Sequence, residues 1–304
     1  MDLEERFFEG TVQLEQLLAC GGAGSVWRVL DNAHVPAQVR ALKCIYRNSF
    51  SEKHVNEELD ILRRVSGGPH VVSILRSCEQ DDRVLILMEL YDTDLGAAIA
   101  NQHVALARNH AKARRVVPQL ITAVRFCHET ANVFHRDIKP ENIMLRLGQP
   151  ELDVVLVDFG LATTSRTSSD FGIGTTQYMT PEAFDSAYND EPSYSCSHSD
   201  LWALGVVLYE LLTGDTPWRT PSRDDEDFAT FQQDPVSFCK GRSSISTPIQ
   251  QLLPRIFAPD WRDRMSLEDF AFAVEQEVGD MREPTVSDQE LDNAEIKCRW
   301  TEST

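Results

Sequence analysis

Short apolar runs separated by polar turn residues dominate the first ninety positions of the chain, which is the pattern of β-strands. Glycine, aspartate, asparagine or proline bounds the runs. The predicted strands are TVQLEQLLA (11–19), SVWRVL (25–30), QVRALKCIY (38–46), VVSILRS (71–77) and RVLILMEL (83–90). One helical pattern interrupts them between Ser51 and Val65, where Ser51 is a candidate cap and Gly67-Gly68-Pro69 a terminator. The N-terminal part is therefore predicted to be a small β-rich unit with one helix.

Long helical patterns replace the strands after Asp94. The clearest of them run from Arg108 to Glu129 and from Asp200 to Leu212, and Gly214 is the predicted C-cap of the second. Residues 276–304 lose the apolar periodicity and carry eight acidic against three basic side chains, which predicts a weakly ordered acidic tail. A β-rich part followed by a helical part indicates an α+β fold.

Composition narrows the possible partners and surroundings. The chain has 29 Lys and Arg against 48 Asp and Glu, a formal charge of −19, which argues against nucleic-acid binding and favours basic partners. Its seven cysteines are scattered and never spaced as C-x-x-C, so neither a disulfide framework nor a zinc ribbon is indicated. The first ten residues lack the features of a signal peptide, and no apolar run reaches the roughly 18 residues of a membrane span. We expect a monomer in the cytoplasm, the nucleus or both, bound to no membrane.

Two motifs carry the strongest chemical signal. His135-Arg136-Asp137-Ile138-Lys139-Pro140-Glu141-Asn142 is followed, sixteen residues after Asn142, by Asp158-Phe159-Gly160. Asp-Phe-Gly alone fits an ordinary turn after a strand, but the pair in this order and at this distance resembles the signatures of eukaryotic protein kinases. The resemblance implies a bilobal protein kinase fold over residues 7–275. Its parts are an N-lobe at 7–89, a hinge at 89–93, a C-lobe at 94–275 and a tail at 276–304.

The resemblance gives each position of these motifs a role. Phosphoryl transfer needs charge placed around the γ-phosphate more than it needs covalent chemistry. Asp137 is expected to accept or orient the proton of the substrate hydroxyl, and Lys139 to neutralise the γ-phosphate. Asn142 and Asp158 are expected to hold Mg²⁺. ATP and magnesium are therefore the implied cofactors.

The N-lobe supplies the predicted phosphate-binding residues. The run Ala19-x-Gly21-x-x-Gly24-x-Val26 resembles the glycine-rich loop over ATP phosphates, although by itself it also fits an ordinary glycine-rich hairpin. Lys43 matches the strand lysine that holds the α- and β-phosphates. Its expected partner is Glu58 rather than Glu57, because Leu62 follows Glu58 by four residues and continues the buried stripe of the helix.

The adenine end of the site is assigned by resemblance as well. Met88-Glu89-Leu90-Tyr91 resembles the hinge between the lobes, with Met88 as gatekeeper and the backbone of Glu89 and Tyr91 facing the adenine. Asp94 is expected near the ribose. The residues expected to sandwich the adenine ring, which would equally suit a plain core, are Val26, Ala41 and Met144.

Further positions indicate the acceptor and the scaffold. Lys139, two residues after Asp137, is typical of kinases that act on serine and threonine in protein substrates. The segment Gly174–Glu182 resembles the one that docks the peptide, and its Thr175 is expected to hydrogen-bond Asp137 and Lys139. Glu182 is expected to pair with Arg264, and Asp200 to hold the backbone of the catalytic loop. Two insertions, at 146–153 and 187–198, are predicted to be surface loops.

Control of activity and choice of substrate stay open on the sequence. Arg136 before Asp137 indicates that an anion in the activation loop organises the site, through phosphorylation or through the fixed charge of Asp170. The candidate phosphorylation sites are Ser165, Thr167, Ser168 and Ser169. Glu141 and Glu210, with Asp94 as a possible third, match positions that often select an upstream arginine.

Three functions compete for this sequence. An active serine/threonine kinase, a phosphotransferase, is favoured over a catalytically weak pseudokinase scaffold, because a degenerate member usually loses Lys43, Asp137, Asn142 or Asp158. A small-molecule kinase of related fold conflicts with Lys139 and with the peptide-docking segment. Trp218 with its surroundings and the run SDFGIGTTQYMTPE narrow the resemblance to fungal serine/threonine kinases of the meiosis-restraining and nutrient-responsive group.

Overall fold

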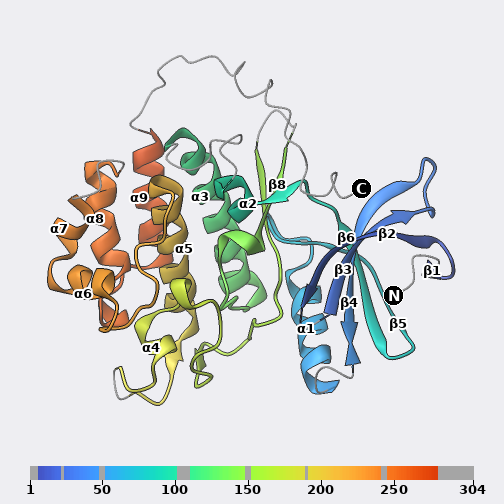
Figure 1. Ribbon diagram of the computed structural model, residues 1–304, viewed down its shortest axis with the longest axis horizontal. Coiled ribbons are helices and arrows are strands. Elements are labelled where there is room, and N and C mark those ends of the chain that lie inside the picture. Colours follow the sequence, from blue (N-terminus) through green and yellow to red (C-terminus); the bar gives the residue numbers. More distant parts are fainter. Residues whose placement is uncertain are drawn as a thin grey trace.

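A computed structural model shows a β-rich lobe beside a helical lobe (Figure 1). The structure describes residues 6–21, 24–47, 52–100, 110–147, 152–188, 191–240 and 245–279. The predicted cap Ser51, the helix start at Arg108 and the tail from residue 280 onward lie outside the described residues. Within the described ranges, no helix is long and apolar enough to cross a membrane.

The N-lobe is built on a six-stranded antiparallel sheet. Its strands, in spatial order, are β1 (Arg6–Phe7), β2 (Val12–Gly21), β3 (Gly24–Asp31), β4 (Gln38–Tyr46), β6 (Arg83–Glu89) and β5 (Ile74–Gln80). The predicted strand at 71–77 starts later than expected, because Val71 forms only an isolated bridge with Leu156. The other four predicted strands match the structure closely.

Both faces of the central strand β6 are buried, which explains its continuous apolar sequence. Leu85 and Leu87 pack into a small core on one face, together with Trp27 of β3. Val84 and Ile86 belong to the large core on the other face. Burial alternates along β3, so Trp27 points into the small core and the neighbouring Val26 to the opposite face.

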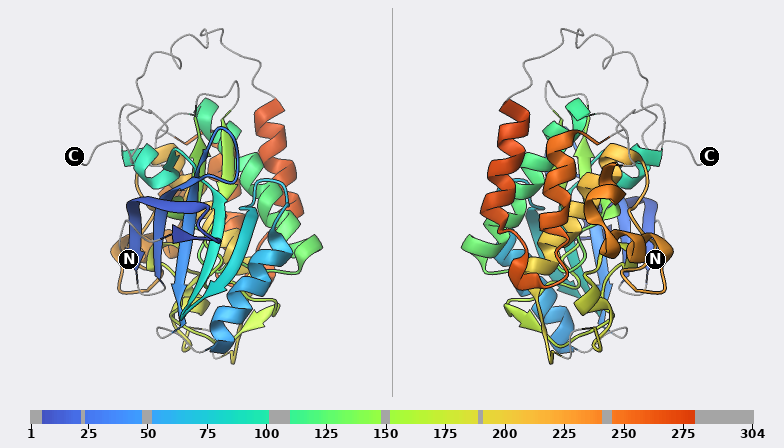
Figure 2. Two further views of the ribbon diagram at one scale, coloured as in Figure 1. Left: turned by 90° about the vertical axis from the view of Figure 1, so that its right-hand side faces the viewer. Right: turned by 90° about the vertical axis from the view of Figure 1, so that its left-hand side faces the viewer.

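Helix α1 (Glu52–Val65) lies along the sheet (Figure 2). Val55, Leu59, Leu62 and Val65 are buried at helical spacing, as the pattern predicts. The helix ends before Gly67, which adopts a left-handed conformation with φ of 84°. Because this stripe fixes the rotation of α1, one face of the helix looks toward the cleft between the lobes.

The C-lobe is a helical bundle around a long buried helix, α5. Its helices are α2 (Leu95–Ala100), α3 (His110–Arg125) with a π-helical continuation at Phe126–Ala131, α4 (Pro181–Phe184), α5 (Cys196–Thr213), α6 (Glu226–Gln233), α7 (Pro235–Lys240), α8 (Thr247–Ile256) and α9 (Leu267–Gly279). Helix α9 continues four residues past the predicted domain end at 275. Short 3₁₀ turns occur at Pro140–Asn142, Thr176–Tyr178 and Trp261–Asp263.

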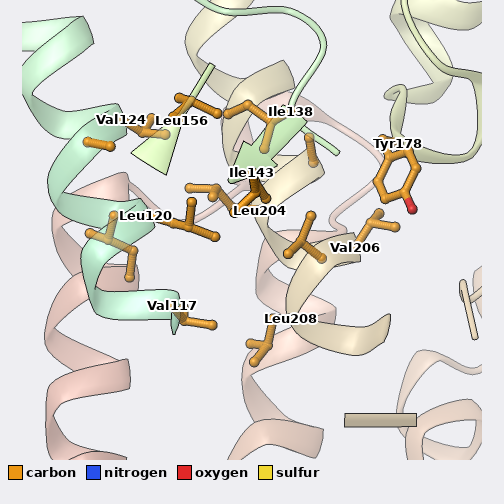
Figure 3. Packing of buried hydrophobic residues seen from close by; sticks show 14 of the residues in the cluster. Val117, Leu120, Val124, Ile138, Ile143, Leu156, Tyr178, Leu204, Val206 and Leu208 are labelled. Carbon is orange, nitrogen blue, oxygen red and sulfur yellow. The ribbon is translucent and has the colours of Figure 1, made fainter. Parts of the chain in front are cut away.

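Helix α5 is surrounded by other elements on nearly every side. Figure 3 shows Leu120 of α3 pointing toward Leu204 of α5, with Ile138 of the catalytic loop and Ile143 above them. A Cβ atom on Gly205 would lie 2.5 Å from the Ile256 side chain, so α8 packs directly on this glycine. Gly214 caps the helix with φ of 86° and donates its N–H to Glu210 O, as predicted.

Two smaller sheets lie outside the six-stranded sheet of the N-lobe. The first contains β7 (Thr93–Asp94), β8 (Ile143–Arg146) and β9 (Asp153–Leu156), so the predicted surface insertion at 146–153 begins and ends in paired strands. The second pairs β10 (Thr167–Ser168) with β11 (Tyr194–Ser195). The prediction that 187–198 forms a surface loop is wrong for its C-terminal part, because Tyr194 and Cys196 are buried.

Candidate active site

A cavity of about 360 Å³ opens between the two lobes. Most of the residues predicted from the sequence to bind ATP or magnesium line it. They are Ala19, Val26, Ala41, Lys43, Met88, Glu89, Tyr91, Asp94, Asn142, Met144 and Asp158. Residues of both lobes, between positions 18 and 158, therefore converge on one cleft.

Two predicted residues, Gly21 and Gly24, do not line the cavity. They pair with each other at the end of the β2–β3 hairpin. A Cβ atom on Gly24 would lie 1.9 Å from the carbonyl oxygen of Cys44, and φ of Gly24 is 144°. The close approach of strand β4 thus requires a glycine at this position. From the sequence, the glycine was explained only by the approach of the loop backbone to the ATP phosphates. Ala19, at the position of the missing first glycine, pairs with Val26 as part of strand β2.

The apolar walls of the cavity come from both lobes. Ala41 of β4 lies opposite Met88 of β6 across the ladder, and Met144 of β8 lines the cavity from the C-lobe. Sequence reasoning missed six lining residues: Leu18, Leu62, Val72, Ile74, Ile86 and Val157. Leu18 directly precedes Ala19, and Val157 directly precedes Asp158. Their position next to predicted site residues could have identified them from the sequence.

Arg146, which the sequence analysis also missed, fastens the hinge to strand β8. Its guanidinium donates to the Glu89 carboxylate and lies 5.3 Å from the centre of the Tyr91 ring. Burial raises the pKa of Tyr91 to about 12. Asp94 is 3% exposed and accepts the backbone N–H of Ala97 at 2.8 Å, so it caps helix α2 as well as lining the cavity.

Lys43 forms the charged centre of the N-lobe wall. Its Nζ lies 2.7 Å from Glu58 Oε1 and 2.9 Å from Asp158 Oδ1. Burial alone would lower the pKa of Lys43, but the two carboxylates outweigh it and raise that pKa. The Lys43 ammonium in turn holds the pKa of Asp158 below its usual range. Glu57 is exposed and pairs with Lys53 instead, so the structure places Glu58 at Lys43 as predicted.

The catalytic loop forms a second charged network around Asp137. Lys139 Nζ lies 2.8 Å from Asp137 Oδ2 and donates to Thr175 Oγ1 at 2.7 Å. Thr175 donates both its N–H and its hydroxyl to Asp137 Oδ1, at 2.9 and 2.7 Å. Asn142 Nδ2 donates to the carbonyl and to the carboxylate of Asp137. One carboxylate is thus oriented by the catalytic loop and by the predicted peptide-docking segment together.

A buried carboxylate, Asp200, holds this loop in place. Its two oxygens accept the backbone N–H groups of His135 and Arg136, each at 2.8 Å. His128, which sequence reasoning missed, bonds the same carboxylate at 2.7 Å. Burial raises the pKa of Asp200, but the contacts with His128 and the loop lower it overall. They stabilise the left-handed conformation of Arg136, whose φ of 65° is strained for a residue with a side chain.

Asn142 and Asp158 fit a magnesium site. Both line the cleft and supply amide or carboxylate oxygens, the ligand type that this ion prefers. Asn142 uses its amide nitrogen toward Asp137, so its oxygen takes no part in those bonds. Across the described ranges, no cluster of three or more His, Cys, Asp or Glu residues forms a closed metal cage. A site with few protein ligands suits Mg²⁺ held jointly by protein, water and phosphates.

Comparison with known proteins assigns this geometry to a family. A family profile described as "Protein kinase domain" matches residues 12–273, which is most of the chain. The chain belongs to the protein kinase family, and the predicted bilobal α+β fold is confirmed.

The curated relatives include several fungal proteins. A Schizosaccharomyces pombe protein named "Negative regulator of sexual conjugation and meiosis" is 31% identical over 87% of this chain and 59% of its own length. The Saccharomyces cerevisiae serine/threonine-protein kinases VHS1 and CHK1 are 32% and 31% identical, over 87% and 79% of this chain and 58% and 46% of their own lengths. The resemblance to fungal serine/threonine kinases is confirmed. The chain spans about half the length of the curated relatives it matches.

Proposed function

We propose that this chain is an active serine/threonine protein kinase that transfers the γ-phosphate of MgATP to hydroxyl groups of protein substrates. The observation that carries the proposal is the meeting of two charged networks at one cleft. Glu58, Lys43 and Asp158 form the first, and Asp137, Lys139 and Thr175 form the second. A pseudokinase scaffold would not need both networks complete.

The residues divide the work of phosphoryl transfer. A bond forms between the substrate oxygen and the γ-phosphorus, the bond from that phosphorus to the bridging oxygen breaks, and ADP leaves. The Asp137 carboxylate, held by Thr175 and Asn142, takes the hydroxyl proton. Lys139 stands beside it to neutralise charge on the transferred group. Magnesium, when bound at Asn142 and Asp158, neutralises phosphate charge.

The contacts of Thr175 support a protein acceptor over a small molecule. Thr175 opens the predicted peptide-docking segment and bonds both Asp137 and Lys139. A peptide seated on this segment would therefore present its hydroxyl to the catalytic carboxylate. The serine/threonine relatives and the lysine at position 139 support the same choice of acceptor.

A preference for upstream basic residues forms the second part of the proposal. Glu141 lines the cleft and lies beside Gly96, near Asp94. Burial raises the pKa of Glu210, but the Tyr178 hydroxyl donates to its carboxylate at 2.6 Å and favours the charged form. These acids supply negative charge next to the docking segment, which suits an arginine side chain. In a peptide array, arginine two or three residues before the acceptor should raise phosphorylation, and Glu141→Ala should reduce that advantage.

The decisive test of the kinase proposal compares wild type with Asp158→Asn on a generic basic protein. Asp158→Asn removes a charge that both Lys43 and the metal require, so phosphate incorporation should fall by at least about a hundredfold. Asp224→Asn, an exposed acid outside the site, is the matched control and should act like wild type. Equal incorporation by Asp158→Asn and wild type would rule out the proposed catalysis.

A further inference from the structure

Arg136 forms an ion pair with Asp170 of the same chain. Its Nη1 donates to Asp170 Oδ2 at 3.0 Å and to Ser168 Oγ at 3.0 Å. Its Nε donates to the carbonyl oxygen of Leu161 at 2.7 Å. The side chain of Arg136 is only 10% exposed, so this guanidinium depends on partners from the protein.

These contacts join three parts of the site. Arg136 directly precedes Asp137 in the catalytic loop, and Leu161 directly follows Asp158-Phe159-Gly160. Asp170 lies in the middle of the activation segment, between β10 and the docking residue Thr175. A single arginine therefore connects the catalytic carboxylate to the segment that must be ordered before a peptide can dock.

The backbone around Asp170 is fixed by the insertion at 187–198. Strand β10 pairs with β11, Thr167 opposite Ser195 and Ser168 opposite Tyr194. Cys196 N donates to Arg166 O at 2.9 Å.

Side chains of the same insertion pack against the backbone next to the ion pair. The Tyr194 hydroxyl donates to Asp170 O at 3.3 Å, and its ring lies 5.9 Å from that of Phe171. Tyr194 and Cys196 are buried against Phe134 and Ala183. The activation segment is thus anchored by strand pairing and packing as well as by charge.

We propose that Asp170 is the permanent counter-ion of Arg136, a positioning residue that keeps the activation segment in the catalytic arrangement without phosphorylation of the loop. In kinases that depend on phosphorylation, a new arginine–phosphate pair orders this loop. Here the Asp170 carboxylate already pairs with Arg136. The β10–β11 pairing holds the segment in place, as an arginine–phosphate pair would otherwise do. The proposal rests on the proposed kinase function and names how that same site is controlled.

The four candidate phosphorylation sites fit this arrangement. Ser168 is buried, and its hydroxyl oxygen accepts hydrogen bonds from Arg136 Nη1 and from the backbone N–H of Asp170. Its hydroxyl therefore completes the ion pair in its unmodified form. Ser165, Thr167 and Ser169 are exposed on the segment. The Arg136 bond lowers the pKa of Asp170, which keeps the carboxylate charged at neutral pH.

The test uses the full chain co-expressed with a protein phosphatase and checked by intact mass to carry no phosphate. This unmodified protein should phosphorylate a serine peptide. Asp170→Asn keeps the shape and removes the charge, so it should lower kcat about tenfold while KM for ATP stays within about twofold. Asp170→Glu restores the carboxylate and should return kcat to within about threefold of wild type. Asp224→Asn controls for the change in net charge and should match wild type.

A second variant keeps the inference testable if Asp170→Asn fails to fold. Ser165→Ala, Thr167→Ala and Ser169→Ala combined leave Asp170 and the Ser168 hydroxyl in place and remove the exposed candidate acceptors, and kcat should stay within about threefold of wild type. The inference is overturned if the unmodified protein gains activity only after loop phosphorylation, or if Asp170→Asn matches wild type. Failure of the proposed function differs: wild type, phosphorylated or not, would then transfer no phosphate to protein.

Discussion

Two arginine–carboxylate pairs hold the activation segment, one at its middle and one at its C-terminal end, and they differ in burial. Arg264 grips Glu182 through two bonds of 2.5 and 2.8 Å, and these side chains are 0% and 5% exposed. Arg136 holds Asp170 through one bond of 3.0 Å, and the Asp170 side chain is 56% exposed. Loss of Glu182 would leave the Arg264 charge in the core, whereas after loss of Asp170 the Arg136 guanidinium keeps its bonds to Ser168 and Leu161. The same chemistry thus stabilises the fold at the C-terminal end of the segment and holds the segment in position at its middle.

The largest effect should come from the buried pair. Glu182→Ala leaves the Arg264 guanidinium without its carboxylate, stacked 4.7 Å from Trp202, and should lower the free energy of unfolding by about 3–5 kcal/mol. Thermal or denaturant unfolding measures this loss. Glu191→Ala removes the acid from an exposed arginine pair with Arg262 and should leave stability unchanged. A Glu182→Ala protein as stable as wild type would contradict the contrast between the pairs.

The pair of Lys43 and Glu58 is intermediate, with exposures of 13% and 3%. Glu58→Gln should reduce kcat/KM about 10- to 100-fold, because Lys43 loses the charge that aims it into the cleft. Glu57→Gln alters the neighbouring exposed acid and should change kcat/KM by less than about twofold. Steady-state kinetics decides, and equal losses in the two variants would argue against the assignment of Glu58.

The exposed pair should matter little for stability. Asp170→Asn should lower the free energy of unfolding by less than about 1 kcal/mol, since the Asp170 carboxylate is largely solvated and Arg136 keeps its bonds to Ser168 and Leu161. Denaturant unfolding of this variant beside wild type provides the measurement. A loss as large as that of Glu182→Ala would show that Asp170 supports the fold rather than the position of the segment.

The smallest effect concerns pH. The folded pKa of Asp170 is lowered, so its ion pair is present above the carboxyl's ordinary pKa of about 3.9 and is lost only as pH falls through the lowered value. Arg136 and Tyr194 contact Asp170, and His54 and Arg64 of α1 line a cavity of about 500 Å³ shared with it.

Limited proteolysis of the activation segment should therefore be unchanged between about pH 7.5 and 5.5 in unmodified protein. A phosphate, whose second pKa is about 6, would lose charge over this range. Faster cleavage at pH 5.5 than at pH 7.5 would contradict a carboxylate counter-ion. Phosphorylated protein, if obtained, provides the comparison.

The sequence predicted best where one loop or one helix carries the information. The helical period of α1 placed Glu58 rather than Glu57 at Lys43, a prediction that depends on local geometry, in which three or four residues fix the direction of a side chain. The meeting of Thr175 with Asp137 and Lys139 was predicted from the resemblance of two motifs to those of protein kinases. The Glu182–Arg264 pair was found despite its long separation because both partners lie in recognisable motifs.

Contacts between unremarkable segments could not be predicted in this way. Strand β11 has two residues and pairs with β10, an equally short strand 27 positions earlier. Two residues are too few to show the alternation of apolar and polar positions that predicts a strand. Arg146 and His128 reach their partners only after the chain folds. Gly24 was identified correctly as a required glycine, but the physical reason is the carbonyl of Cys44.

The most direct measurement is a single-turnover phosphate transfer from γ-labelled MgATP to a peptide containing one serine and one tyrosine after an upstream arginine. Protein verified as unmodified should place the label on serine alone, and Asp137→Asn should abolish the transfer. Label on tyrosine, or equal labelling by Asp137→Asn and wild type, would contradict serine/threonine kinase activity at this cleft.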